Sequence, residues 1–264
     1  RASDLALISR ESPPGAYFFR KTFFFTKVIF GGMFQFLFKT NYPEILVLEY
    51  GIDHPGDMKY LLTIARPNIS VITAIGDIPV HVEFFSGPEE VAREKAKLIE
   101  CLPSAGFAIL NSDDETVIEL KNRTRAHIMT FGFSREAEVR ITNFENRSEK
   151  QRPIGISFKL GYGGSFVPVK LDNIFGKAQG YATAAAAAVG LIFGLNLVRI
   201  SEALKNYKPA EGRMNLLTGV KYTRVIDDSY NASPLSMHAA LDTLRDLPGK
   251  RKIAVLGDML EIGR

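Results

Sequence analysis

From residue 44 onwards, short apolar runs alternate with stretches of helical periodicity, and this alternation limits the possible folds more than any other feature. The apolar runs lie at residues 44–51, 68–76, 106–115 and 126–133. The stretches with helical spacing lie at 57–67, 88–103 and 116–123. Strands that alternate with helices form a parallel sheet, because each helix carries the chain back to the start of the next strand. The predicted fold class is therefore α/β, with a mostly parallel, doubly wound sheet and helices on both faces.

The character of the sequence changes after residue 136. Residues 137–171 contain AEVRITNFE, IGISFKLGYGGSFVPVKL and a glycine turn at 161–164. These features predict a small antiparallel β subdomain with a hairpin. The small-residue stretch at 176–195 predicts a helix that is buried because of its composition, and a further helix is expected at 200–207.

The C-terminal part has the pattern of a second domain. A polar, linker-like stretch at 208–215 precedes a predicted strand at 220–228, a helix at 234–247 and one more strand at 247–259. This order predicts the start of a second Rossmann-like domain, cut where its next helix is expected. We therefore expect three parts: an unplaced segment at 1–42, a central domain at 43–207, and a hinge with a truncated C-terminal domain at 208–264.

The composition is that of an ordinary soluble globular protein. Hydrophobic residues make up 46% and charged residues 23%, and the net charge of +4 is too small to indicate nucleic acid as a partner. The single cysteine, Cys101, excludes an internal disulfide framework and fits a cytoplasmic location. No apolar run reaches the ~18 residues that a membrane span requires, so none is predicted.

Residues 17–38, YFFRKTFFFTKVIFGGMFQFLF, contain nine of the 19 phenylalanines, interleaved with Arg20, Lys21 and Lys27. A segment that lies on a membrane surface is one interpretation. The favoured interpretation is a core element whose packing partners lie outside this sequence.

Carboxylates follow several of the predicted strands. Glu49 ends the run at 44–51, Asp113 and Asp114 end the run at 106–115, and Asp227 and Asp228 end the run at 220–228. Gathered at the carboxyl edge of one sheet, such side chains would suit Mg²⁺, which prefers oxygen ligands and accompanies nucleotide phosphates. A lone acid at a strand end more often serves as a cap.

Three further residues are weak signals when taken one at a time. His81 follows a strand and a Gly–Asp–Ile–Pro loop, where a solvated histidine is the ordinary case. Lys95 lies in a helix between other charged residues, and Arg213 has a planar donor group suited to phosphate but lies in a linker.

A phosphate-binding loop is not evident. The nearest match, GAYFFRKT at 15–22, lacks the second glycine, carries bulky aromatic residues and follows SRESPP rather than an apolar strand. Bulky residues would prevent the backbone from closing around a phosphate, so this match is interpreted as coincidence.

Several stretches together resemble the Mur ligase family. GRMN, DDSYNASPLSMHAAL and KIAVLGDMLEIG resemble its hinge and the start of its C-terminal domain. LEYG, PGDM, ITAIG, VHVEFFSGPEEVAREK and LNSDDE resemble its central ATPase domain. The resemblance covers residues 43–264, and within the family it points to the member that joins UDP-N-acetylmuramoyl-tripeptide to D-alanyl-D-alanine.

The resemblance implies an ATP-dependent amide ligase of peptidoglycan precursor synthesis that is a monomer when complete. Glu49 and His81 would bind Mg²⁺, and Lys95 falls where the family has a carbamylated lysine that binds a second Mg²⁺. The residues implied for the nucleotide pocket are Asn111, Asp113, Gln179, Arg213, Asp227, Asp228, Tyr230 and Asn231. The stretch DDSYNASP would then be a joint that brings carboxylate and tyrosine to the nucleotide as two domains close.

Three departures from the family pattern are present. The GxxGKT loop is missing from this sequence, Ala178 and Gln179 replace a histidine–asparagine pair, and Lys97 replaces an acid. The chain is accordingly expected to be an incomplete ligase that does not turn over alone. Two alternatives are a non-catalytic relative that binds a nucleotide or a protein partner, and a ligase of the same superfamily with another substrate.

Overall fold

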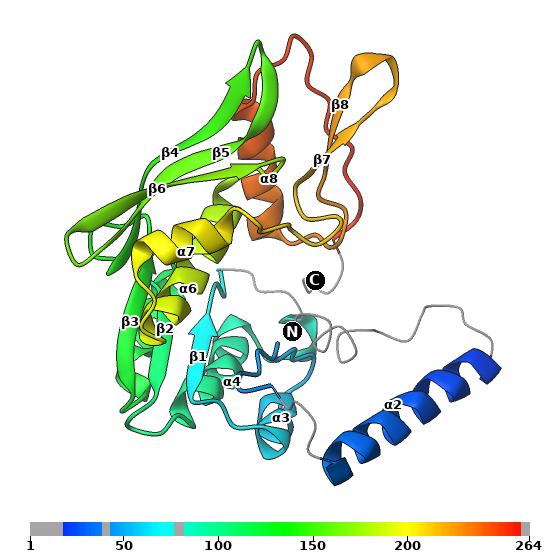
Figure 1. Ribbon diagram of the computed structural model, residues 1–264, viewed down its shortest axis with the longest axis vertical. Helices are drawn as coiled ribbons and strands as arrows, with labels where there is room; N and C mark the ends of the chain where they lie inside the picture. The colour runs from blue at the N-terminus through cyan, green and yellow to red at the C-terminus, as the bar shows by residue number, and fades with distance from the viewer. Residues whose placement is uncertain (1–17, 39–42, 77–81, 260–264) are drawn as a thin grey trace. The chain divides into compact units, whose positions relative to one another are not determined.

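The computed structural model describes residues 18–38, 43–76 and 82–259 (Figure 1). The chain divides into two compact units, residues 1–49 and residues 50–264. The second unit contains a six-stranded sheet and a separate two-stranded sheet.

The six strands of the larger sheet lie side by side in sequence order, from β1 to β6. Their bounds are β1 Ile69–Ile72, β2 Phe107–Asn111, β3 His127–Gly132, β4 Val139–Glu149, β5 Arg152–Tyr162 and β6 Ser165–Asp172. Strands β1 to β4 pair in parallel, whereas β4, β5 and β6 pair antiparallel. The mostly parallel α/β fold is thus confirmed, and the predicted antiparallel strands continue the same sheet.

Helices cover both faces of this sheet, as predicted. Strand β2 shows the division, because Ala108 and Leu110 pack in one hydrophobic cluster while Ile109 packs in the other. The first cluster includes residues of α4 (Pro88–Glu100) and α5 (Glu115–Glu119), and a 3₁₀ turn, η2 (Leu120–Arg123), follows α5. The second includes residues of α6 (Lys177–Ile192) and α7 (Leu197–Leu204). A strand that is apolar on both sides requires two covered faces.

Small side chains allow α6 to approach the sheet closely. Ala184, Ala187 and Ala188 are fully buried. A Cβ added to Gly180 would lie 3.3 Å from the ring of Phe133 and 3.4 Å from the side chain of Ile141. A larger residue at position 180 would therefore push the helix away from β3 and β4.

Helix α3 (Asp57–Ile64) packs against α4 through a small cluster that contains Met58 and Val91. A short 3₁₀ turn, η1 (Val82–Phe84), precedes α4.

The C-terminal part consists of β7 (Asn215–Thr218), η3 (Val220–Tyr222), β8 (Arg224–Asp227) and α8 (Pro234–Asp246). Strands β7 and β8 form the antiparallel two-stranded sheet. Helix α8 starts with a capping box, in which Ser233 accepts from the Ser236 N–H and Ser236 accepts from the Ser233 N–H. The sequence does not predict β7, because its first residue, Asn215, belongs to the polar stretch at 208–215 that has the composition of a linker.

Two predicted strands do not form. Residues 44–51 and 247–259 run without strand pairing in the part of the chain that the structure describes. Their apolar side chains lie exposed, with Val47 at 82% and Val255 at 92%. An apolar run becomes a strand only when a neighbouring strand takes its backbone N–H and C=O groups, and no described neighbour does so here.

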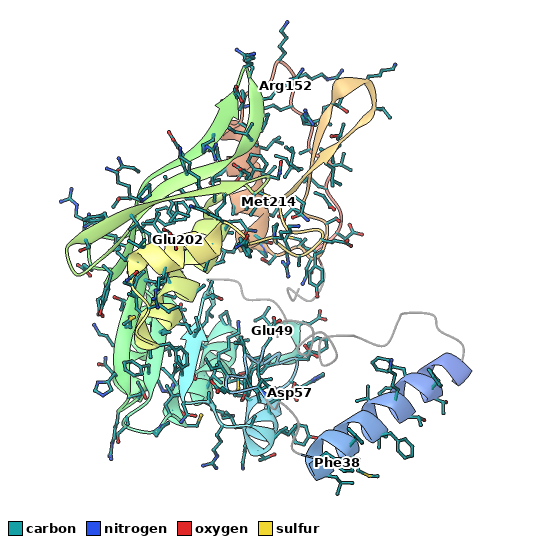
Figure 2. All side chains as sticks on the ribbon, viewed as in Figure 1. Phe38, Glu49, Asp57, Arg152, Glu202 and Met214 are labelled. Atoms are coloured by element: carbon teal, nitrogen blue, oxygen red, sulfur yellow. The ribbon has the colours of Figure 1, made fainter. Side chains whose placement is uncertain are left out.

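Residues 18–38 form one helix, α2 (Phe18–Phe38). Its side chains project around the whole helix in Figure 2, where Phe38 marks its last residue. Phe23 is 73% exposed and Ile29 is 64% exposed, so the described residues do not cover this helix, and a core element whose packing partners lie outside this sequence stays a prediction. No helix among the described residues is long and apolar enough to cross a membrane.

Candidate functional site

The carboxyl end of β2 carries a cluster of polar side chains. Asp113 accepts hydrogen bonds from the Phe133 N–H at 2.5 Å, from the Ser134 N–H at 2.9 Å and from the Tyr181 hydroxyl at 2.9 Å. It therefore joins the end of β2 to the end of β3 and to α6. Burial is the main reason that the pKa of Tyr181 is raised, and its bond to Asp113 adds to the effect.

Asn111, the last residue of β2, is buried, and its side chain forms hydrogen bonds with the surrounding backbone. Its Nδ2 donates to the Thr73 carbonyl at 2.8 Å, and its Oδ1 accepts from the Asp113 N–H at 3.0 Å. Both ends of the amide are thus engaged. Asn111 fixes the chain that leaves β1 against the turn that leaves β2.

Asp114 holds the neighbouring turn with three backbone donors. Its carboxylate accepts from the N–H groups of Val117, Ile75 and Gly76 at 3.0, 2.8 and 3.0 Å. It is also the N-cap residue of α5. The carboxyl ends of β1 and β2 are thereby bound to each other and to the start of α5.

Lys95 lies on α4 close enough to Asp114 for their charges to interact. Burial lowers the pKa of the Lys95 ammonium, and the Asp114 carboxylate opposes that shift. A lysine with a lowered pKa has a larger neutral fraction, and the neutral amine is the nucleophilic form. Lys95 is therefore suited to reaction with an electrophile or to a change of charge state.

A second cluster lies where α6 meets the chain that leads into β7. Gln179, in the first turn of α6, is buried and accepts from the Tyr207 hydroxyl at 2.8 Å. Its Nε2 donates to the Arg213 carbonyl at 3.5 Å. Gln179 thus attaches this part of the chain to the larger sheet.

Arg213, Asp228 and Tyr230 meet at this joint. The Arg213 guanidinium lies over the Tyr230 ring, 4.2 Å from its centroid. The Asp228 carboxylate accepts from the Met214 N–H at 3.1 Å. Burial raises the pKa of Asp228, whereas the Met214 N–H and Arg213 act in the opposite direction.

Gly212 is required at this joint for two reasons. Its φ of +70° is a conformation that other residues rarely adopt, and an added Cβ would lie 2.9 Å from the Tyr230 nitrogen. The Tyr230 N–H donates to the Gly212 carbonyl at 3.2 Å. Gly212 therefore lets residues 212 and 230 approach each other closely.

The two clusters are linked through α8. A Cβ on Gly76, which Asp114 holds, would lie 3.5 Å from the side chain of Leu235 in the first turn of α8. At the other side, Gly176 at the start of α6 lies close to Thr243 of α8 and to Met214. The carboxyl edge of β1 to β3 and the joint at 212–230 therefore border the same region.

The structure corrects the prediction that three strand ends bring their carboxylates to one sheet. Of these acids, Asp113 and Asp114 lie at the edge of the larger sheet, whereas Asp227 ends β8 of the smaller sheet and Asp228 directly follows it. Glu49 lies in the first unit with its side chain exposed and ends no strand, and His81 lies outside the described residues. Among the described residues, no group of three or more His, Cys, Asp and Glu side chains could hold a metal ion.

Of the remaining predicted nucleotide residues, Asp227 is half-buried and Asn231 is exposed. Asp227 accepts from the Ser229 N–H at 3.2 Å, and Asn231 accepts from the Ala232 N–H at 2.8 Å. Asp227 ends β8, and Asn231 lies in the short connection between β8 and α8.

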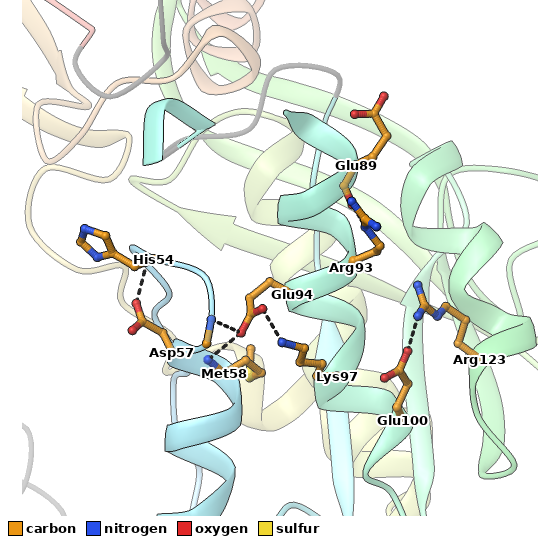
Figure 3. A network of polar contacts seen from close by, with 10 residues as sticks. His54, Asp57, Met58, Glu89, Arg93, Glu94, Lys97, Glu100 and Arg123 are labelled. Atoms are coloured by element: carbon orange, nitrogen blue, oxygen red, sulfur yellow. Dashed lines mark hydrogen bonds and ion pairs between the residues drawn. The ribbon is translucent and has the colours of Figure 1, made fainter. Parts of the chain in front are cut away.

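Glu94 has a role that the sequence interpretation missed. It is 4% exposed, and its carboxylate accepts from the Gly56 and Met58 N–H groups at 3.1 Å each and from the Lys97 ammonium at 2.5 Å (Figure 3). The available signal was spacing, because position 94 falls three residues after Val91 on the apolar side of α4. Lys97, noted above as a departure from the family pattern, is the cation that pairs with this buried acid.

A separate groove of about 1000 Å³ lies on the second unit, lined by residues of β6, α7 and β7. None of the predicted site residues lines it. The candidate site is therefore the edge of the sheet together with the joint, and not this groove.

Comparison with known proteins identifies the family of the chain. The model of the Mur ligase middle domain matches residues 32–190, and the model of the Mur ligase glutamate ligase domain matches residues 212–264. The UDP-N-acetylmuramoyl-tripeptide–D-alanyl-D-alanine ligase of Mycobacterium tuberculosis is 31% identical over 230 residues, which cover 85% of this chain and 44% of the relative. The Rickettsia prowazekii ligase of the same name is 27% identical over 224 residues, 83% of this chain and 48% of the relative.

Solved structures of MurF share the fold of this chain. MurF from Thermotoga maritima in complex with ADP has a TM-score of 0.73 at 27% identity, over 84% of this chain and 50% of that chain. MurF from Acinetobacter baumannii has a TM-score of 0.71 at 29% identity, over 81% of this chain and 45% of that chain. The chain spans about half the length of the curated relatives it matches.

Proposed function

The chain belongs to the Mur ligase family, and on this premise we propose that it is part of an ATP-dependent ligase that joins D-alanyl-D-alanine to UDP-N-acetylmuramoyl-tripeptide. In this reaction the carboxylate of the tripeptide takes the γ-phosphoryl group of ATP and forms an acyl phosphate, with ADP released. The amine of D-alanyl-D-alanine then attacks the acyl carbon, and phosphate leaves. The proposed domains are residues 43–207 for the central part and 208–264 for the C-terminal part.

The observation that carries the proposal is the joint between the larger sheet and the C-terminal part. Arg213 and Tyr230 are exposed at this joint, and Asp228 lies next to them. A relative with the same fold has been solved with ADP. We assign the nucleotide to this joint because an exposed guanidinium is suited to bind phosphate oxygens with two parallel N–H groups.

The other predicted nucleotide residues divide into two groups by their contacts. Asp227 and Asn231 lie near the nucleotide in our proposal and are accessible to it. Asn111, Asp113 and Gln179 hold backbone or hydroxyl groups, so we propose that they position the walls of the pocket. Their substitution would then act through the shape of the site.

We propose that Lys95 is carbamylated and that the carbamate would bind Mg²⁺, while Glu49 and His81 stay the further Mg²⁺ ligands that the family resemblance implies. A neutral lysine amine adds to CO₂ and loses a proton, which gives an anionic carbamate, and the lowered pKa of Lys95 favours the amine that this step needs. Bound Mg²⁺ would neutralise charge on the nucleotide phosphates. We also propose that the protein is cytoplasmic, consistent with its single thiol, Cys101, and acts as a monomer.

The test is the ligase reaction with protein expressed from its complete reading frame, followed as phosphate released in the presence of both substrates. Arg213→Ala is expected to lower kcat/KM at least about tenfold, because it removes charged hydrogen bonds to the nucleotide. Arg152→Ala is the matched control, since Arg152 lies at the exposed start of β5. Lys95→Ala is expected to abolish turnover, and bicarbonate should not restore it.

Full activity of Lys95→Ala would exclude the carbamate. Equal activity of Arg213→Ala and the wild type would place the nucleotide elsewhere. ATP binding without amide formation would show a binding protein and not a ligase.

A further inference from the structure

Helix α2 separates its charged residues from most of its apolar ones. At about 100° per residue, Arg20, Lys21, Lys27 and Gln35 fall within a sector of roughly 140°. This sector also contains Phe24, Val28, Gly31, Gly32 and Phe38. The opposite half of the helix contains only apolar residues and two threonines. Its apolar positions are Phe18, Phe19, Phe23, Phe25, Ile29, Phe30, Met33, Phe34, Phe36 and Leu37.

The apolar face of α2 lies open along its length. Phe23, Phe30 and Leu37, at successive seven-residue steps, are 73%, 62% and 65% exposed. A single helix cannot bury its own side chains, and an exposed apolar face of this length is marginal in water. Some other surface must therefore cover it.

The charges of α2 indicate what kind of surface that is. The helix contains no acidic residue, so all of its charged residues are basic. Helices that pack on a protein core more often present both signs of charge to water. Phenylalanine and leucine on one face with lysine and arginine on the other is the pattern of helices that lie in the interface of an anionic bilayer.

We propose that α2 docks on an anionic lipid surface and lies in its plane. The apolar face that contains Phe23, Phe30 and Leu37 would lie at the boundary of headgroups and acyl chains. The basic sector that contains Lys27 would contact the headgroup phosphates. This proposal is independent of the ligase reaction, since no residue of the candidate site takes part in it.

The test is co-sedimentation of the full 264-residue chain with vesicles. One set of vesicles contains phosphatidylcholine alone, and the other contains phosphatidylcholine and phosphatidylglycerol in equal parts. The chain is expected to sediment with the mixed vesicles and to be released largely by high salt, because screening weakens contacts with the headgroups. Equal sedimentation with both kinds of vesicle, or with neither, would overturn the proposal.

Two variants test the two faces separately. Lys27→Glu is expected to weaken binding to the mixed vesicles at least about fivefold, the contribution of one basic residue near such a surface. Phe30→Ser is expected to weaken it roughly tenfold or more through lost apolar burial. The control is Val220→Ser, which removes an apolar side chain that is 82% exposed on the other unit.

The outcomes that exclude lipid are distinct. If the chain self-associates without vesicles and Phe30→Ser abolishes that association, the partner is a second copy and the proposal is wrong. If Phe30→Ser also lowers helix content by circular dichroism, Lys27→Glu decides alone, since it leaves the apolar face intact. Unchanged vesicle binding by Lys27→Glu would then overturn the proposal.

Discussion

Replacing Glu94 tests how α4, the helix that carries Lys95, is attached to the rest of the second unit. Glu94→Ala leaves the N–H groups of Gly56 and Met58 without their acceptor, and Met58 is only 2% exposed. Hydrogen bonds to charged groups contribute about 1.5 kcal/mol each at the low end, which gives roughly 3 kcal/mol for the two. The ion pair with Lys97 adds less than about 1 kcal/mol, because Lys97 is half-exposed.

We therefore expect Glu94→Ala to lower the free energy of unfolding by about 3 to 4 kcal/mol, as measured by urea denaturation followed by circular dichroism. Glu94→Gln keeps an oxygen acceptor for the two N–H groups, so it should lose about half as much. The matched control is Glu89→Ala on the exposed first turn of the same helix, where only about 0.5 kcal/mol from the helix dipole is at stake. If Glu94→Ala costs no more than Glu89→Ala, the Glu94 carboxylate does not stabilise the fold through these two N–H groups.

Three further predictions concern the candidate site. Burial lowers the pKa of Lys95 in the folded state, so the charged ammonium destabilises the folded state at lower pH. This destabilisation disappears as the pH rises from the lowered pKa towards the ordinary value of 10.5. Urea denaturation should thus show the wild type gaining stability relative to Lys95→Met as the pH rises, and a constant difference would contradict the shift. Gly212→Ala should cost about 1 to 3 kcal/mol and displace Tyr230, since φ is +70° and the added Cβ meets the Tyr230 nitrogen. If thermal unfolding shows that Gly212→Ala is as stable as the wild type, this prediction is wrong. Tyr181→Phe removes one donor to Asp113 and should cost about 1 kcal/mol in urea denaturation. A neutral result would mean that the other donors of Asp113 suffice.

The spacing of apolar residues predicted the strands of the larger sheet and the helices that cover it, because each of them buries the face on which its apolar residues recur. Helix α4 is an example, since Val91, Ala92, Ala96 and Ile99 all lie in the core. Asp113 and Asp114 were likewise found from the sequence, because acids that follow a buried strand come to the sheet edge.

The failures have physical reasons as well. The runs at 44–51 and 247–259 have the composition of strands, but strand formation depends on a pairing partner, which local sequence does not specify. The position of Asp228 on a second sheet depended on β7, whose pairing with β8 is set by contacts between segments. The acceptor role of Glu94 depended on the first turn of α3, where Met58 lies 36 residues away from it in sequence.

Calorimetric titration of ADP into the 264-residue chain shows whether a nucleotide binds at the joint of Arg213 and Tyr230. We expect measurable but weak binding, because this sequence contains no GxxGKT loop to hold the phosphates. Arg213→Ala should weaken this binding at least about tenfold, whereas Arg152→Ala should leave it unchanged. Equal affinity of the wild type and Arg213→Ala would show that the nucleotide does not bind at this joint.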